Sequence, residues 1–205
     1  MNPFLKYAAR FLSLVFHPLL LPTYAFAMII LSQPFLFAAY DGGEWVLVVR
    51  VFVNTFVFPV LCLFLLWRLG WLKSFEAATR EERIVPYIAI GTLYMWTFIT
   101  FRKSPEPQVL NVVLLGSCLA LFACFFANIF SKISIHAAGF GCLMVLAFLN
   151  TWFAAYDVRW LLLVVVLVAG LVGSSRLYLR SHTLKEVMTG FLVGIAAQMM
   201  AFNFY

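Results

Sequence analysis

QVLNVVLLGSCLALFACFFANIF, residues 108–130, contains no charged side chain. A continuous apolar run of about 20 residues is long enough to cross the hydrocarbon core of a bilayer as one helix. The run does not alternate between polar and apolar residues, as a strand of a transmembrane barrel would. A helix also satisfies its own backbone hydrogen bonds in lipid. This stretch therefore predicts a transmembrane helix.

Six further apolar runs of this kind cover residues 11–32, 46–69, 84–101, 134–155, 159–175 and 184–203. Of the 205 residues, 65% are hydrophobic and 11% are charged, whereas a soluble domain has about 45–50% and about 25%. This composition excludes a soluble globular enzyme and a disordered chain. We predict an all-α fold, a polytopic membrane helical bundle with six to seven transmembrane helices, in which residues 1–205 form a single membrane-embedded domain.

Two of the predicted spans contain residues that bear on their packing. In the first span, His17-Pro18 and Pro22 predict a kink. We interpret His17 as a structural hydrogen-bonding residue at this kink, inside the span and away from both faces, with a lipid-access groove as the alternative. In the last span, Gly190 and Gly194 form a small-xxx-small pattern, which predicts close approach of a neighbouring helix.

The basic residues are unevenly distributed between the two sides of the predicted bundle. With seven spans, the connections after spans two, four and six lie on the side of the N-terminus, which we call the N-terminal face. Ten of the 14 basic residues lie there, namely Lys6, Arg10, Arg68, Lys73, Arg80, Arg83, Lys132, Arg176, Arg180 and Lys185. This bias places the N-terminal face in the cytoplasm, although leaving out five possible site residues reduces it to five against four.

The connection between spans six and seven contains His182 and Glu186, four residues apart. On one helix face, the carboxylate can fix the imidazole tautomer, which a nucleophilic or basic histidine needs. Alternatively, Thr183-x-x-Glu186 is a capping box that opens the last helix. The two interpretations compete for the same carboxylate.

The other two connections on this face contain further candidates. Ser134 and His136 open the fifth span next to Lys132, which we interpret as an interfacial anchor. A single histidine at a helix start is more often a satisfied interfacial residue than a catalyst. The connection before the third span has two arginines, Arg80 and Arg83. Its simplest interpretation is a solvated charged loop, but guanidinium groups also suit bidentate phosphate binding.

Together, the three connections combine two histidines with a carboxylate, a serine and several cations. They contain no cluster of carboxylates suited to a metal, no GxSxG elbow and no P-loop. Histidines among cations favour phosphoryl transfer, because cations stabilise the anionic group while one imidazole attacks and another donates a proton.

This pattern resembles the type-2 phosphatidic acid phosphatase superfamily of membrane lipid phosphatases, and in particular a short divergent bacterial branch. The family has three motifs in order, K-x6-R-P, P-S-G-H and S-R-x5-H-x3-D. Ser175, Arg176, His182 and Glu186 match the third motif, with Glu in place of Asp. The resemblance covers about residues 70–200.

The two other motifs match in part. Ser134 and His136 match the second motif, without its proline and glycine. Lys73 and Arg80 match the first motif at the right spacing, but a glutamate replaces the proline. Arg80 with Arg83 is the alternative pair for this motif.

The resemblance implies a role for each matching residue. His182 would be the nucleophile that forms a phosphohistidine, and Glu186 would orient it. His136 would protonate the leaving oxygen and then activate water. The residues implied to bind phosphate are Arg176, Arg80, Lys73, Ser134 and Arg83.

The implied activity is that of a metal-independent phosphatase without a cofactor, located in the inner membrane of a bacterium. Its substrate would be a lipid phosphate such as phosphatidic acid, phosphatidylglycerol phosphate, undecaprenyl diphosphate or lipid A. The expected partners are this substrate and membrane lipids, not nucleic acid, and the oligomeric state stays open. A lipid phosphotransferase, or a non-catalytic membrane protein that binds or transports anions or lipids, is the alternative.

Overall fold

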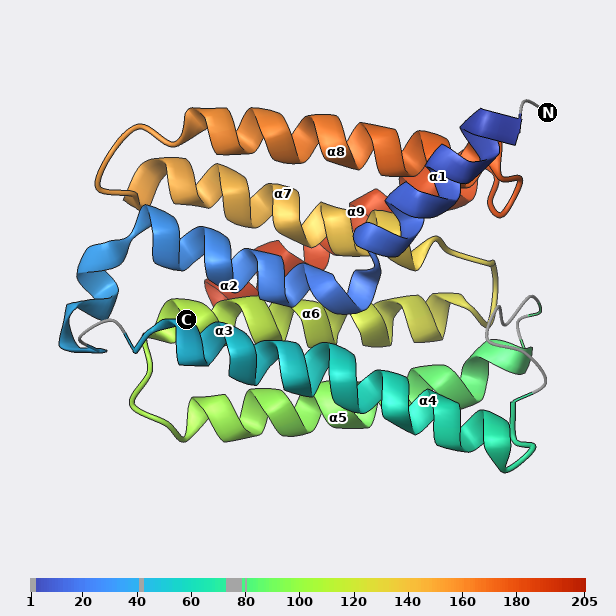
Figure 1. The fold of residues 1–205 in the computed structure, drawn as a ribbon, viewed down its shortest axis with the longest axis horizontal. Coiled ribbons are helices and arrows are strands. Elements are labelled where there is room, and N and C mark those ends of the chain that lie inside the picture. The colour runs from blue at the N-terminus through green and yellow to red at the C-terminus, as the bar shows by residue number, and fades with distance from the viewer. Residues whose placement is uncertain (1–2, 41–42, 73–78, 80) are drawn as a thin grey trace.

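The computed structural model describes residues 3–40, 43–72, 79 and 81–205. Within these ranges it contains helices and no strand, and seven helical segments are long and apolar enough to cross a membrane. These segments lie side by side along the long axis of the molecule (Figure 1). The prediction of an all-α polytopic membrane bundle is therefore confirmed.

The seven segments, in chain order, comprise the following elements. They are α1 (Pro3–Val15), η1 (Pro18–Leu20) and α2 (Leu21–Ser32); α3 (Trp45–Phe52), the π-helical η3 (Val53–Val57) and α4 (Phe58–Arg68); η4 (Glu81–Arg83) and α5 (Ile84–Arg102); α6 (Gln108–Ala127); α7 (Ile135–Phe153); α8 (Arg159–Tyr178); and α9 (Leu184–Asn203). A further 3-10 segment, η2 (Pro34–Tyr40), follows α2.

The first segment is broken rather than kinked. α1 ends at Val15, and His17 is extended, with φ −65° and ψ 139°. The residue before a proline avoids the α region, and Pro18 has no N–H to continue the helix. The break brings His17 next to His136 at the start of α7, with ring centroids 5.6 Å apart. His17 lies within the first segment, Pro3–Ser32, as predicted.

A proline also shapes the second segment. Pro59 has no N–H to donate to the carbonyl of Thr55, which lies four residues earlier, and the helix widens into a π turn over η3. The carbonyl of Thr55 instead accepts a hydrogen bond from the Tyr94 hydroxyl on α5, at 3.3 Å. This side-chain contact joins the second segment to the third.

Glycines allow α7 and α9 to pack closely. A Cβ atom at Gly190 would lie 2.6 Å from the Ser134 carbonyl oxygen, and one at Gly194 would overlap the Ala138 carbonyl. The prediction of close approach at these two glycines is confirmed. Because the contact begins at Ser134, it holds the start of α7 against the start of α9, where His136 and His182 are found.

The described residues of three connections lie together with α1 at one end of the bundle, on the right in Figure 1. These connections are the segments that join α4 to α5, α6 to α7 and α8 to α9, as the alternation of spans predicts. At this end, α1 packs against α8.

Candidate functional site

The chain reverses sharply at the end of α8. The N–H of Ser181 donates to the Arg176 carbonyl at 3.1 Å, and the N–H of Arg180 donates to the Leu177 carbonyl at 2.9 Å. These two bonds form a Schellman motif, whose left-handed position is usually a glycine. Here Arg180 takes it, with φ 52°. The reversal turns the chain back so that His182 and Arg176 line the same cavity.

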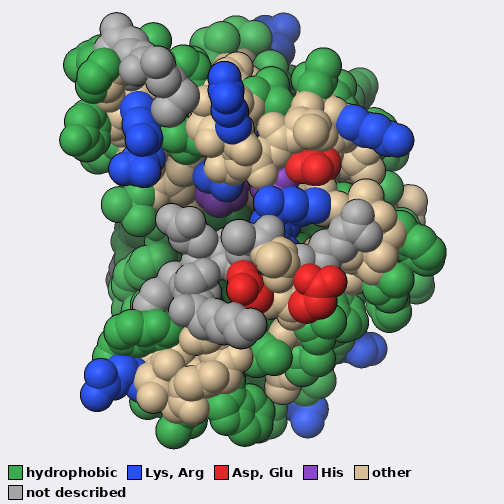
Figure 2. All heavy atoms as spheres, turned by 90° about the vertical axis from the view of Figure 1, so that its right-hand side faces the viewer, with side chains coloured by type: hydrophobic (Ala, Val, Ile, Leu, Met, Phe, Trp, Pro, Cys, Tyr) green, Lys and Arg blue, Asp and Glu red, His purple; other side chains and the backbone are tan. Residues whose placement is uncertain are grey.

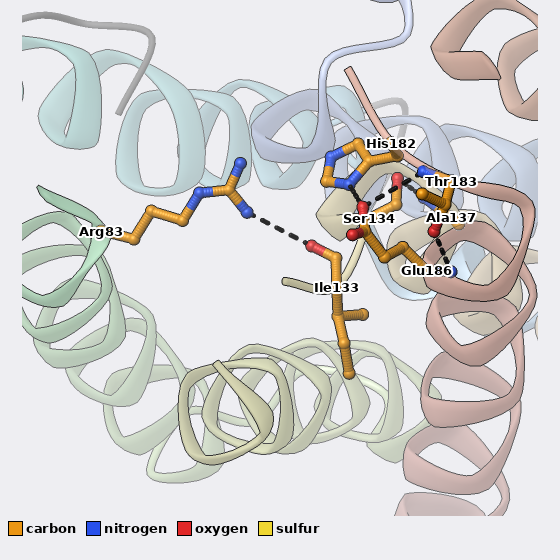
Figure 3. Close-up of polar contacts among 7 residues, drawn as sticks. All are labelled: Arg83, Ile133, Ser134, Ala137, His182, Thr183 and Glu186. Atoms are coloured by element: carbon orange, nitrogen blue, oxygen red, sulfur yellow. Dashed lines mark hydrogen bonds and ion pairs between the residues drawn. The ribbon is translucent and has the colours of Figure 1, made fainter. Parts of the chain in front are cut away.

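A single carboxylate oxygen holds His182 and caps α9. Glu186 Oε2 accepts from His182 Nδ1 at 2.8 Å and from the Thr183 N–H at 3.2 Å. The Thr183 hydroxyl in turn accepts from the Glu186 N–H at 3.3 Å, which completes the capping box. Glu186 therefore both caps α9 and contacts His182 (Figure 3), but the two residues do not share a helix face, because α9 begins at Leu184. Because a carboxylate only accepts, Nδ1 carries the proton and Nε2 keeps its lone pair.

His182 is held in its neutral form. Its side chain is only 3% exposed. Burial lowers the pKa of His182 below the usual 6.5; the hydrogen bond to Glu186 opposes this shift, and the positive charges of Arg176 and Arg83 add to it. A neutral imidazole with a free lone pair on Nε2 is the form that a nucleophile requires.

Ser134 begins α7 and is fully buried. Its hydroxyl accepts from the Ala137 N–H at 3.4 Å and so caps the helix. Its own N–H donates to the Glu186 carbonyl at 3.3 Å. Ser134 is not among the residues that line the cavity described below, and we therefore assign its hydroxyl no phosphate contact.

His136 is anchored by the N-terminal helix. Its Nε2 lies 3.1 Å from the carbonyl oxygen of Ser13. A carbonyl oxygen only accepts, so Nε2 carries a proton and Nδ1 is the atom free to exchange one. The neighbouring His17 accepts from the Leu19 N–H at 3.3 Å through its Nδ1 and caps η1. This confirms the predicted structural hydrogen bond of His17 at the break.

Arg83 links the connection between α4 and α5 to the other two connections. Its Nη1 donates to the Ile133 carbonyl at 3.4 Å. Since the next residue, Ser134, is bonded to Glu186, these contacts tie all three connections together (Figure 3). The two other candidates of this connection, Lys73 and Arg80, lie outside the described residues.

The three connections and α1 surround one cavity of about 810 Å³. All charged side chains among its described lining residues are basic, and no carboxylate is among them. They are Lys6, Arg10, Arg83, Lys132 and Arg176, accompanied by His17, His136 and His182. Figure 2 shows histidine side chains between lysines and arginines at this end of the molecule.

Two of these cations are held at an electrostatic cost. Arg176 is half-buried, and its Nε atom is shielded from solvent with no hydrogen-bond partner among the described residues. A buried donor left without a partner is unfavourable. Burial also lowers the pKa of Lys132, with Arg83 and Arg176 adding to the shift against the opposing effect of Glu186. An anion in the cavity would relieve both costs.

Sequence reasoning missed the contribution of α1. Lys6, Arg10, Ser13 and His17 all line the cavity. The spacing of four and three residues puts Lys6, Arg10 and Ser13 on one face of α1, and His17 follows in the break after this helix. This spacing is visible in the sequence, but Lys6 and Arg10 were interpreted only as charges on the N-terminal face.

No known protein family, curated protein or solved structure matches this chain. The candidate function therefore rests on the chemistry of the cavity.

Proposed function

We propose that this chain is an integral-membrane phosphatase that hydrolyses a lipid phosphate through a phosphohistidine at His182. The observation that carries the proposal is the cavity itself. Among the described residues, five cations and three histidines line it, no carboxylate does, and Arg176 Nε has no hydrogen-bond partner. A phosphoryl group stays anionic throughout transfer, so this lining stabilises the ground state and the transition state.

We assign each histidine one reacting nitrogen, the one that does not make its hydrogen bond to Ser13 or Glu186. In the first step, His182 Nε2 attacks phosphorus, and the bond to the leaving oxygen breaks. Neutral His136 relays a proton through Nδ1 from the monoanionic phosphate of the substrate to that oxygen, and the lipid alcohol leaves. In the second step, neutral His136 takes a proton from water at Nδ1 as the water attacks the phosphohistidine, which releases phosphate and restores His182.

The cations of the cavity lie at the end of a membrane bundle, so a phosphate bound among them would be at the level of the lipid headgroups. This position favours phosphates that are attached to a lipid. Phosphatidic acid, phosphatidylglycerol phosphate, undecaprenyl diphosphate and lipid A all present such a group.

The test is phosphate release from a panel of these lipids by purified protein. His182→Ala should reduce release at least about a thousandfold, as loss of a nucleophile does in other enzymes. Arg159→Ala, at an exposed position on the opposite end of α8, is the matched control and should retain wild-type rates. EDTA should leave the rates unchanged.

Two outcomes would contradict the proposal. Unchanged release by His182→Ala would remove the nucleophile assignment. A wild-type protein that binds phosphate but releases none from any lipid would instead be an anion-binding protein. Transfer of phosphate to an added alcohol in place of water would identify a phosphotransferase, whose first step is the same.

A further inference from the structure

The cavity is deeper than a phosphate requires. On α7 its lining runs from His136 to Leu146, ten residues apart, which is about 15 Å at the helical rise of about 1.5 Å per residue. On α6 it runs from Cys124 to Val113, eleven residues or about 16 Å. Two helices thus give the same depth independently. The hydrocarbon core of a bilayer is about 30 Å thick, so the cavity extends from the headgroup level to about the bilayer midplane.

The deep part of the cavity is apolar. Its walls include Ala25 on α2, Val113 on α6 and Leu143 on α7, all of which belong to the buried core. Two hydroxyls also line it, but both are used elsewhere. Ser117 donates to the Val113 carbonyl at 2.9 Å, and Tyr94 donates to the Thr55 carbonyl at 3.3 Å.

This lining determines what the deep part can hold. Water needs two to four polar partners to remain in a buried site, and all charged groups among the described lining residues belong to the elements at the N-terminal face. A hydrocarbon chain needs no polar partner and gains contact with the walls. A volume of about 810 Å³ is also within the range of about 300–1,000 Å³ that pockets for sizeable organic ligands have.

We propose that the deep part holds one hydrocarbon chain of the substrate, inside the bundle between α2, α6 and α7, while its phosphate lies among the cations. Resting on the proposed function, this inference narrows the substrate class to lipids in which one chain can leave the bilayer and enter the protein. The depth of about 15 Å matches the reach of one chain through one leaflet, which is half of the bilayer core. Chain length up to this depth should therefore contribute to recognition.

The experiment measures kcat/KM for methyl, n-butyl, n-octyl and n-dodecyl phosphate with protein in lipid nanodiscs. Ser117 lies seven residues from Cys124, and so about 10 Å from the polar end of the cavity. Ser117→Phe should fill the cavity at this depth. Each methylene excluded from the cavity costs about fourfold in affinity. Ser117→Phe should therefore lower kcat/KM at least about tenfold for the two long chains and leave methyl phosphate unchanged. Partitioning into the nanodisc affects both proteins equally and cancels from the comparison.

Three variants control for structural damage. Ser117→Ala removes the same hydroxyl without filling the space, and Leu167→Phe adds bulk at a lipid-facing position that is 68% exposed. Both should keep the wild-type dependence of kcat/KM on chain length. Ala25→Leu narrows the cavity from α2 and should reproduce the chain-length effect if Ser117→Phe fails to fold. Loss of activity on all chains alike, with wild-type folding, would overturn the inference.

Photocrosslinking locates the chain without any hydrolysis. An alkyl phosphate with a terminal diazirine should label Val113, Leu143 or Leu146, identified by mass spectrometry. Labelling confined to lipid-facing positions such as Leu167 would overturn the inference, even if the protein is a phosphatase. Labelling of the deep residues by a protein that hydrolyses no substrate would support chain binding and refute the proposed function.

Discussion

The imidazole rings of His17 and His136 meet edge to face, with centroids 5.6 Å apart and planes inclined by 77°. The contact joins a residue from the break after α1 to the proposed acid–base residue at the start of α7. His17 also caps η1 through its Nδ1. His17 therefore has two roles that substitutions can separate. Its ring packs against His136, and its Nδ1 caps η1.

Two substitutions at His17 should separate these roles. His17→Phe keeps an aromatic ring against His136 but loses the cap, so it should retain activity and lose about 1 kcal/mol of stability. His17→Asn keeps a cap but loses the ring, so it should retain stability and lower kcat roughly tenfold to a hundredfold, because His136 is less well positioned. Equal effects of both substitutions on kcat and on thermal unfolding would show that His17 has only one role.

The pH dependence should reflect the neutral state of His182. Since burial lowers the pKa of His182 below 6.5, this proposed nucleophile stays unprotonated as pH falls through 6.5. The acid limb of kcat/KM that this residue sets should therefore lie below pH 6.5. Glu186 raises this pKa, so Glu186→Gln should move the limb to still lower pH and reduce kcat.

The same shift has a consequence for stability. Below pH 6.5 the unfolded chain binds a proton at His182 more readily than the folded chain does, so the contribution of His182 to stability falls as pH decreases through this range. His182→Gln should make unfolding less dependent on pH there. For catalysis, an acid limb of kcat/KM above pH 6.5 that disappears in a His182 variant would contradict the assignment of a neutral, buried imidazole.

The membrane spans could be predicted from the sequence because hydrophobicity alone decides which segments enter lipid. The consequences of the break after α1 could not be predicted in the same way. Pro18 indicates that the helix changes direction but not by how much. The contact between His17 and His136 depends on that direction, which tertiary packing of α1 against α8 sets.

Ser134 and Glu186 show a second limit of sequence reasoning. Both lie at helix starts, where the same side chain can cap the helix or serve a site. For Ser134 the structure shows the cap, and its hydroxyl is buried. For Glu186, one oxygen makes the cap and also holds His182. At the sequence level both residues are typical of a helix cap, and only the structure shows that Glu186 also holds His182.

The hydrogen bond between Tyr94 and Thr55 should depend on Pro59. In the wild type, Tyr94→Phe leaves the buried Thr55 carbonyl without this donor, which should cost about 1–3 kcal/mol of stability. Pro59→Ala restores an N–H that can donate to the same carbonyl. In that background, Tyr94→Phe should cost much less, and a double-mutant cycle of unfolding measures the difference. Additive effects would show that the π turn and the tyrosine are independent.

Arg176 should lower the stability of the empty protein and raise the stability of the anion-bound protein. Its Nε has no partner among the described residues, and the guanidinium lies among other cations that line the cavity. Arg176→Met keeps much of the side-chain volume and removes the charge. It should therefore raise Tm without ligand, because an imperfectly paired, partly buried charge is unfavourable, and weaken phosphate binding.

Thermal unfolding with increasing inorganic phosphate tests both effects in one titration. Wild type should gain stability with phosphate, by about 2.7 kcal/mol at a concentration 100 times the Kd, and Arg176→Met should gain little. Arg159→Met removes an arginine at the other end of α8 and should follow the wild-type curve. If Arg176→Met instead lowers Tm without ligand and keeps the full phosphate response, Arg176 supports the fold and does not bind the anion. A residue that is kept for function at the expense of stability should show the opposite behaviour.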